Sequence, residues 1–130
     1  MADRYAGDWS VGELTPGEWR IDSQAAVFSG NRGQTLALIG CRSGRLSIVR
    51  AGPGYAPRGV LRIRTSAGER ELPVEGAELQ AFGTSLPAAD PLFDQILYSR
   101  GRFVIEATGQ APLVLPTRPE VQRVVEDCRG

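Results

Sequence analysis

Two cysteines are the residues whose type and placement most directly predict chemistry. Cys41 ends the most apolar stretch of the chain, 34–41, and Cys128 lies on the apolar side of the last predicted helix. Both are therefore expected at the core, either as a disulfide or as two reduced thiols that pack as small hydrophobic groups. A disulfide over so long a loop stabilises a fold by about 4–5 kcal/mol in the chain-entropy model and implies an oxidising compartment. We favour the disulfide over the two reduced thiols. A catalytic thiol is a third possibility that we discount, because it would have no His partner.

The chain contains no His and no Lys, and these absences exclude most known catalytic constellations. Without His there is no Ser–His or Cys–His nucleophile pair and none of the usual zinc sites. Without Lys there is no Schiff-base chemistry and no P-loop. We therefore predict no metal, no cofactor and no enzymatic activity.

Carboxylates are the remaining catalytic option. Glu69 and Glu71 share one face of a predicted strand, as the paired acids of a hydrolase would. Arginines of the preceding strand are expected opposite them, and an acid paired with arginine stays ionised, which makes it unsuited to donate a proton. Glu126 and Asp127 lack partner ligands for a metal ion. A carboxylate-dependent hydrolase is therefore the less favoured interpretation.

Aromatic and loop residues supply the candidates for binding. The loop 52–59 (GPGYAPRG) lacks the glycine spacing of a nucleotide-binding loop and leads into a strand, but it could present Tyr55 and Arg58 to a ligand. The alternative for this loop is a wide connection between strands, which we favour. Trp9 and Trp19 either stack on a ligand or cover one open end of a small β fold, and we favour the covering role.

The elements that must position these residues are mostly short strands separated by turn residues. The segment 34–41 is almost continuously apolar, which is typical of a central strand covered on both faces. A turn at Ala67 and Gly68 would set Arg64 opposite Glu71 on neighbouring strands. The predicted strands are 18–22, 24–29, 34–41, 45–50, 60–65, 69–74, 79–86, 103–107 and 112–115.

Two helices are predicted late in the chain. Asp90 and Pro91 are typical of an N-cap and the first helical residue, and Gly101 is typical of a helix end. For the second helix, Thr117 and Glu120 match a capping box. Its apolar stripe is marginal in isolation, so the helix must dock on the strands. The stripe consists of Val121, Val124, Val125 and Cys128.

Two stretches, 8–20 and 90–129, resemble a group of uncharacterised small bacterial proteins. In the second stretch the shared features are a short helix, SRGRF at 99–103, LP at 115–116 before the last helix, and the closing EDCR at 126–129. The layout of strands, helix, strand pair and late cysteine is also similar to that of invasion-associated locus B-like envelope proteins. Neither resemblance implies an activity, and no functional residue is carried across.

Length, composition and charge limit the architecture and the partners. With 130 residues, 42% of them hydrophobic, the chain suits one domain over 1–130 in which 1–16 are largely irregular. We predict a mainly β fold bordering on α+β: an antiparallel sandwich or partly open barrel of about eight strands with two short helices, the second C-terminal. Fifteen basic and fifteen acidic residues cancel, so no charge field favours nucleic acid. No apolar run is long enough to span a membrane.

These observations favour a non-enzymatic binding or envelope-associated domain with a protein or cell-envelope ligand, stabilised by Cys41 and Cys128. It would be periplasmic or otherwise exported if the disulfide forms. The first alternative is a cytosolic adaptor or regulatory partner with reduced cysteines, and the second is a carboxylate-dependent hydrolase of cell-wall material. The start of the chain carries neither an apolar segment nor a cleavage site, so either the protein is cytosolic or a signal segment has been removed.

Overall fold

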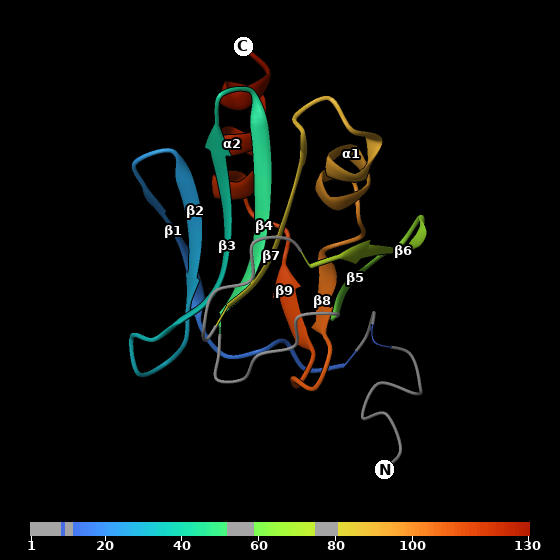
Figure 1. The fold of residues 1–130 in the computed structure, drawn as a ribbon. Coiled ribbons are helices and arrows are strands. Elements are labelled where there is room, and N and C mark those ends of the chain that lie inside the picture. The colour runs from blue at the N-terminus through green and yellow to red at the C-terminus, as the bar shows by residue number, and fades with distance from the viewer. Residues whose placement is uncertain (1–8, 10–11, 52–58, 75–80) are drawn as a thin grey trace.

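The computed structural model, which describes residues 9, 12–51, 59–74 and 81–130, contains two antiparallel sheets that pack face to face. The five-stranded sheet has the order β1-β2-β3-β4-β7, and the four-stranded sheet has the order β6-β5-β8-β9 (Figure 1). This arrangement confirms the predicted mainly β sandwich with two helices, the second of them C-terminal. The elements are β1 (Glu18–Asp22), β2 (Ala25–Ser29), β3 (Thr35–Arg42), β4 (Arg45–Ala51), β5 (Val60–Thr65), β6 (Gly68–Pro73), β7 (Ala81–Pro87), α1 (Pro91–Leu97), β8 (Arg102–Ala107), β9 (Leu113–Pro116) and α2 (Pro119–Arg129).

Tight hairpins fix the register of the five-stranded sheet. Two-residue loops join β1 to β2 and β3 to β4, and Ser23 and Ser43 adopt φ of 57° and 52° in them. Positive φ at such a position matches the turn to the twist of the strands. The second loop continues with Gly44 at φ 74°, a conformation that glycine adopts without steric cost. The local sequence therefore determines which residues of these strands face inward.

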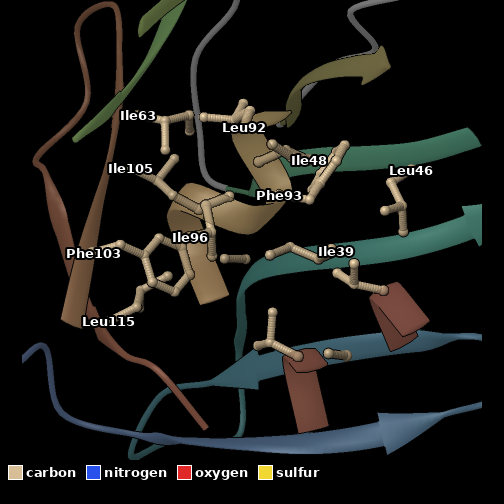
Figure 2. Close-up of a cluster of buried hydrophobic side chains, with 14 of the residues drawn as sticks. Ile39, Leu46, Ile48, Ile63, Leu92, Phe93, Ile96, Phe103, Ile105 and Leu115 are labelled. Atoms are coloured by element: carbon tan, nitrogen blue, oxygen red, sulfur yellow. The ribbon is translucent and has the colours of Figure 1, made fainter. Parts of the chain in front are cut away.

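The core lies on the inner face of the five-stranded sheet. Ile39 of β3 and Ile48 of β4 are fully buried there, as the two-residue period of a strand requires. The four-stranded sheet covers part of this face, and α2 packs across β1, β2, β3 and β4 over another part. Figure 2 shows Phe93 and Ile96 of α1 between these strands and Ile105 of the four-stranded sheet. The core is therefore shared by both sheets and both helices.

β3 is the central strand of its sheet, as its apolar run predicts, but only one of its faces is fully buried. Ile39 is fully buried on the inner face, whereas Leu38 on the outer face is only half-buried. The prediction of cover on both faces is therefore wrong. In the register of the sheet, Leu38 lies between Val27 and Val49, so apolar residues of three neighbouring strands shield one another, and no described helix or strand forms a second layer over them.

The β5–β6 register differs by two residues from the predicted one. Arg64 lies opposite Glu69, and Glu71 lies opposite Arg62, so the predicted pairing of Arg64 with Glu71 is wrong. A shift of two residues leaves every side chain on its predicted face, because the side-chain period of a strand is also two. The inference that acids of β6 match arginines of β5 therefore holds, with the partners exchanged.

The register is shifted because the hairpin turns one residue earlier than predicted. Thr65 pairs with Gly68, which leaves Ser66 and Ala67 as the loop. Two hydroxyl groups hold this turn: Thr65 Oγ1 accepts from the Ala67 N–H at 3.2 Å, and Ser99 Oγ accepts from the Ser66 N–H at 3.0 Å. Ser99 lies beyond α1, so part of what selects the turn is distant in sequence.

The capping box predicted for α2 is absent. The N-cap is Arg118 in an extended conformation (φ −130°, ψ 160°). Among the described residues, no side chain caps the helix, and the buried Thr117 Oγ1 has no hydrogen-bond partner. The reason is Pro119, which disfavours helical geometry at the residue before it and suits the first helical position itself. Glu120 consequently lies one position too early in the helix to complete a box. The predicted stripe is nevertheless buried at all three valines.

Asp90 caps α1 as predicted and also joins it to the four-stranded sheet. Its carboxylate accepts from the Leu92 N–H at 2.9 Å and from both terminal nitrogens of Arg70, at 2.5 and 3.2 Å. The hydrogen bond from Arg70 and, secondarily, that from Leu92 hold the pKa of Asp90 below its ordinary value. The helix ends at Leu97, before the predicted stop at Gly101, which lies in the following turn.

We expect Asp90→Ala to lower the free energy of unfolding by about 1–2 kcal/mol at pH 7, the usual cost of losing an N-cap. Because folding depresses the pKa of Asp90, its carboxylate stabilises the fold above the unfolded-state value of about 3.9 and stops doing so as pH falls through the folded-state value. Urea unfolding at several pH values should therefore show the difference between variant and wild type shrinking below about pH 4.

The matched control is Asp127→Asn, because the side chain of Asp127 is 78% exposed. This variant should change stability by less than about 0.5 kcal/mol. A loss for Asp90→Ala that is as large at pH 2.5 as at pH 7 would contradict the assignment to the charged carboxylate.

Candidate functional site

A disulfide joins the last turn of α2 to the centre of the five-stranded sheet. Cys41 of β3 and Cys128 of α2 are bonded, with Cα atoms 5.6 Å apart, although they are 87 positions apart in the sequence. Both residues are half-buried. Val124 and Val125, one turn earlier on α2, are buried against the core, so the apolar stripe of the helix holds Cys128 over β3. The structure therefore brings together the two cysteines that the sequence singles out.

A cleft of about 250 Å³ opens beside this disulfide, between the β1–β2 hairpin and α2. Ile21 and Val124 form apolar parts of its wall. Arg123 and Asp127 lie on the helix side, 4.0 Å apart, with side chains 73% and 78% exposed. An ion pair this exposed contributes little to stability. The cleft can therefore receive an apolar group while both charges stay accessible at its rim.

Trp19 is part of the core. It is only 6% exposed, and its ring meets Phe28 edge-on at a centroid distance of 5.3 Å and stacks on Phe103 at 6.4 Å. Its indole N–H donates to the Pro116 carbonyl at 2.8 Å. Because Phe28 belongs to one sheet and Phe103 to the other, Trp19 ties the two sheets together. The ring is enclosed between the two sheets, so its face is not available for stacking on a ligand.

The remaining binding candidates are placed differently. Trp9 is half-buried in the irregular part of the chain that precedes β1. Tyr55 and Arg58 lie outside the described residues. Of the four candidate binding residues, the described structure thus places one in the core and one partly at the surface.

The acids that suggested a hydrolase contact arginines. Glu71 lies 2.6 Å from Arg62, and Glu69 lies 3.3 Å from Arg64, which also contacts Glu106 at 2.7 Å. Across the described ranges, no cluster of three or more His, Cys, Asp or Glu side chains is arranged to hold a metal ion. These carboxylates therefore form a charge ladder across the four-stranded sheet.

Arg50 is a buried cation that the sequence interpretation missed. It is 7% exposed, donates to the Ala51 carbonyl, and donates to the Ala111 carbonyl at 3.1 Å. Burial lowers the pKa of its guanidinium. Leu46, Ile48 and Arg50 alternate along β4, so the period of two already predicts that Arg50 points inward. Its hydrogen bonds connect β4 with the β8–β9 hairpin.

Comparison of the chain with family models, curated proteins and solved structures finds no match. The two resemblances noted in the sequence therefore stay predictions. In the part of the chain that the structure describes, neither helix has the length and apolar character needed to cross a membrane.

Replacing both cysteines (Cys41→Ser with Cys128→Ser) should lower the free energy of unfolding by about 3–5 kcal/mol, because the disulfide closes a long loop. Urea unfolding of the oxidised protein and of the double variant measures this loss. Reduced wild-type protein is the matched control and should unfold at nearly the same urea concentration as the double variant. Equal stability of the oxidised and reduced wild type would contradict a stabilising role for the bond.

Proposed function

We propose that this protein is a non-enzymatic binding domain that acts in an oxidising compartment, as a periplasmic or otherwise envelope-associated protein. The observation that carries the proposal is the Cys41–Cys128 disulfide. Such bonds persist outside the reducing cytosol and are rare within it. A domain of 130 residues has a modest core, so a bond from its last helix to its central strand is a substantial part of its stability.

The chemistry of the side chains supports binding over catalysis. The chain has no His and no Lys, and Glu69, Glu71 and Glu106 all contact arginine. A general acid needs a carboxyl group that holds its proton near neutral pH, and contact with arginine works against that. The cleft beside the disulfide is instead suited to recognition, since it combines apolar walls with exposed charges of both signs.

The proposal predicts that both cysteines are oxidised in protein recovered from its native compartment. Cells should be quenched with a membrane-permeable alkylating reagent before lysis, and the intact mass of the purified protein then measured. We expect no alkylated cysteine before reduction and two after reduction with dithiothreitol. Protein produced in a reducing cytosol is the control and should carry two alkyl groups without prior reduction.

Two alkylated thiols in natively located protein would overturn the exported assignment and favour a cytosolic adaptor. A hydrolase of cell-wall material would be favoured instead by turnover of purified peptidoglycan that is lost when Glu69 and Glu71 are both changed to Gln. We expect no such turnover.

A further inference from the structure

The outer edge of β1 is an open template for another strand. The Cys41 N–H donates to the Gln24 carbonyl at 2.9 Å. Backbone groups of successive residues in a strand point to opposite sides, so Gln24 and Ala26 form hydrogen bonds with β3. Ala25 and Val27 then form hydrogen bonds with β1. The same alternation on β1 turns the N–H and C=O groups of Trp19 and Ile21 away from β2. Within the described ranges, these four groups have no hydrogen-bond partner beyond the sheet.

Both edges of the four-stranded sheet are protected in ways that β1 is not. At the β9 edge, the Thr15 N–H donates to the Val114 carbonyl and the Val114 N–H donates to Thr15 Oγ1, both at 2.8 Å. The β6 edge carries Pro73, which has no N–H to offer. β1 is the first strand of the five-stranded sheet and forms its free left margin in Figure 1. An unprotected edge favours pairing with another chain.

Two hollows lie along the helix side of β1. Ile21 lines the 250 Å³ cleft beside the disulfide, and Trp19 lines a hollow of about 480 Å³ that also involves Leu14, Pro116 and Glu120. Trp19 and Ile21 are two residues apart, which is about 7 Å along a strand. An added strand would direct alternate side chains, with the same spacing, into both hollows. Ile21 is 38% exposed, so an apolar partner there would bury surface that water now contacts.

The opposite face of β1 carries alternating charge. Glu18, Arg20 and Asp22 follow one another on that face, and the Arg20–Asp22 contact of 3.5 Å joins side chains that are 54% and 65% exposed. Such a contact is weak, so all three charges can pair across to a new strand. Opposite charges directly across a ladder stabilise it, and like charges destabilise it.

We propose that β1 binds an extended peptide of a partner protein by antiparallel strand addition, the peptide reading basic–apolar–acidic–apolar–basic. This inference rests on the proposed binding function and specifies its site and ligand class. The basic residues lie opposite Glu18 and Asp22, and the acidic residue lies opposite Arg20. The two apolar side chains enter the hollows at Trp19 and Ile21, and main-chain hydrogen bonds to those residues supply the affinity.

A second copy of the chain fits this edge less well. In the antiparallel register that uses all of β1, two copies would set Arg20 against Arg20 and Glu18 against Asp22, which are like charges. A register centred on Ile21 matches Arg20 with Asp22, but it places Ser23 at the hollow beside Trp19. The partner strand that satisfies every position is therefore a heterologous one.

The test uses the full-length oxidised protein and a fluorescent synthetic peptide centred on Lys-Val-Glu-Val-Lys. Fluorescence anisotropy should show saturable binding to a monomer, whose state is followed by analytical ultracentrifugation. The charge-reversed peptide Glu-Val-Lys-Val-Glu should bind at least about tenfold more weakly, since three attractive cross-strand pairs become repulsive. Equal affinity for the two peptides, no binding, or dimerisation of the protein through β1 would overturn the proposal.

Backbone methylation of the peptide tests the hydrogen bonds without altering the protein. N-methylation of both Val residues blocks the N–H groups that face Trp19 and Ile21, and binding should be lost. N-methylation of the central Glu leaves those groups intact, because its N–H points away from β1, and binding should persist. In hydrogen exchange, the peptide should protect the amides of Trp19 and Ile21. If both methylated peptides bind alike, strand addition is ruled out.

A pair of protein variants locates the site. Ile21→Lys places a charge beside Arg123 in the cleft and should weaken peptide binding at least about tenfold, since inward-pointing charges block edge pairing. Val60→Lys is the matched control: Val60 is 37% exposed, against 38% for Ile21, but lies on β5 of the other sheet. It should bind the peptide as wild type does. Circular dichroism establishes that both variants are folded, and the methylated peptides decide the outcome if one is not.

Failure here is distinguishable from failure of the proposed function. Oxidised cysteines in the native compartment with no peptide binding would remove the β1 site and leave an exported binding domain. Reduced cysteines there would remove the exported assignment whatever the peptide does.

Discussion

The unequal coverage of the larger sheet is the constraint on which the rest of the structure depends. The four-stranded sheet covers only part of the inner face of the five-stranded sheet, and apolar residues continue beyond it along β3 and β4. Uncovered, this surface would cost a large share of the hydrophobic stabilisation of so small a domain. The two short helices remove it from water. Neither helix is long enough to be stable alone, so each depends on the surface that it covers.

Long-range polar contacts hold this arrangement in place at several points. The Trp19 indole reaches Pro116, Arg50 reaches Ala111, and Arg70 reaches Asp90, and each contact joins segments that are distant in the sequence. In each contact a side-chain N–H donates to a backbone carbonyl or a carboxylate that would otherwise need water as its hydrogen-bond donor. The disulfide belongs to the same set, since it fixes the one helix that touches four strands of the larger sheet. A few hydrogen bonds, one ion pair and the disulfide thus fix the relative positions of elements that the hydrophobic core alone would hold together without a specific orientation.

Local patterns predicted most of the elements, because the spacing of apolar residues in a segment depends mainly on whether that segment is a strand or a helix. The stripe of Val121, Val124 and Val125 identified the buried side of α2, and the N-cap at Asp90 located the start of α1. Errors arose where one local rule opposed another, as when Pro119 excluded the capping box. Others arose where a distant group decided, as when Ser99 stabilised the turn after β5.

The candidate site was only partly foreseeable for the same reason. The two cysteines were identifiable because each lay at the end of a strongly apolar pattern. The edge position of β1 was not, because strand order in a sheet is a tertiary property that alternation along one strand does not encode. Trp19 is of a residue type that often stacks on ligands, and only its contacts with Phe28 and Phe103 show that its ring is enclosed. By contrast, the inward orientation of Arg50 could have been predicted, because buried and less buried side chains alternate along β4.

The distance in sequence between the bonded cysteines also affects how the molecule is made. Residue 41 leaves the ribosome or a translocation channel long before residue 128, which lies 87 positions later in the chain. During that interval the early thiol sits on a hydrophobic strand whose covering helix does not yet exist. The chain contains just two cysteines, so these residues cannot pair incorrectly within one molecule, and competing disulfides form only with other molecules, a second copy of the chain among them. Biosynthetic yield should therefore depend on how dilute the nascent chains are as well as on the oxidant.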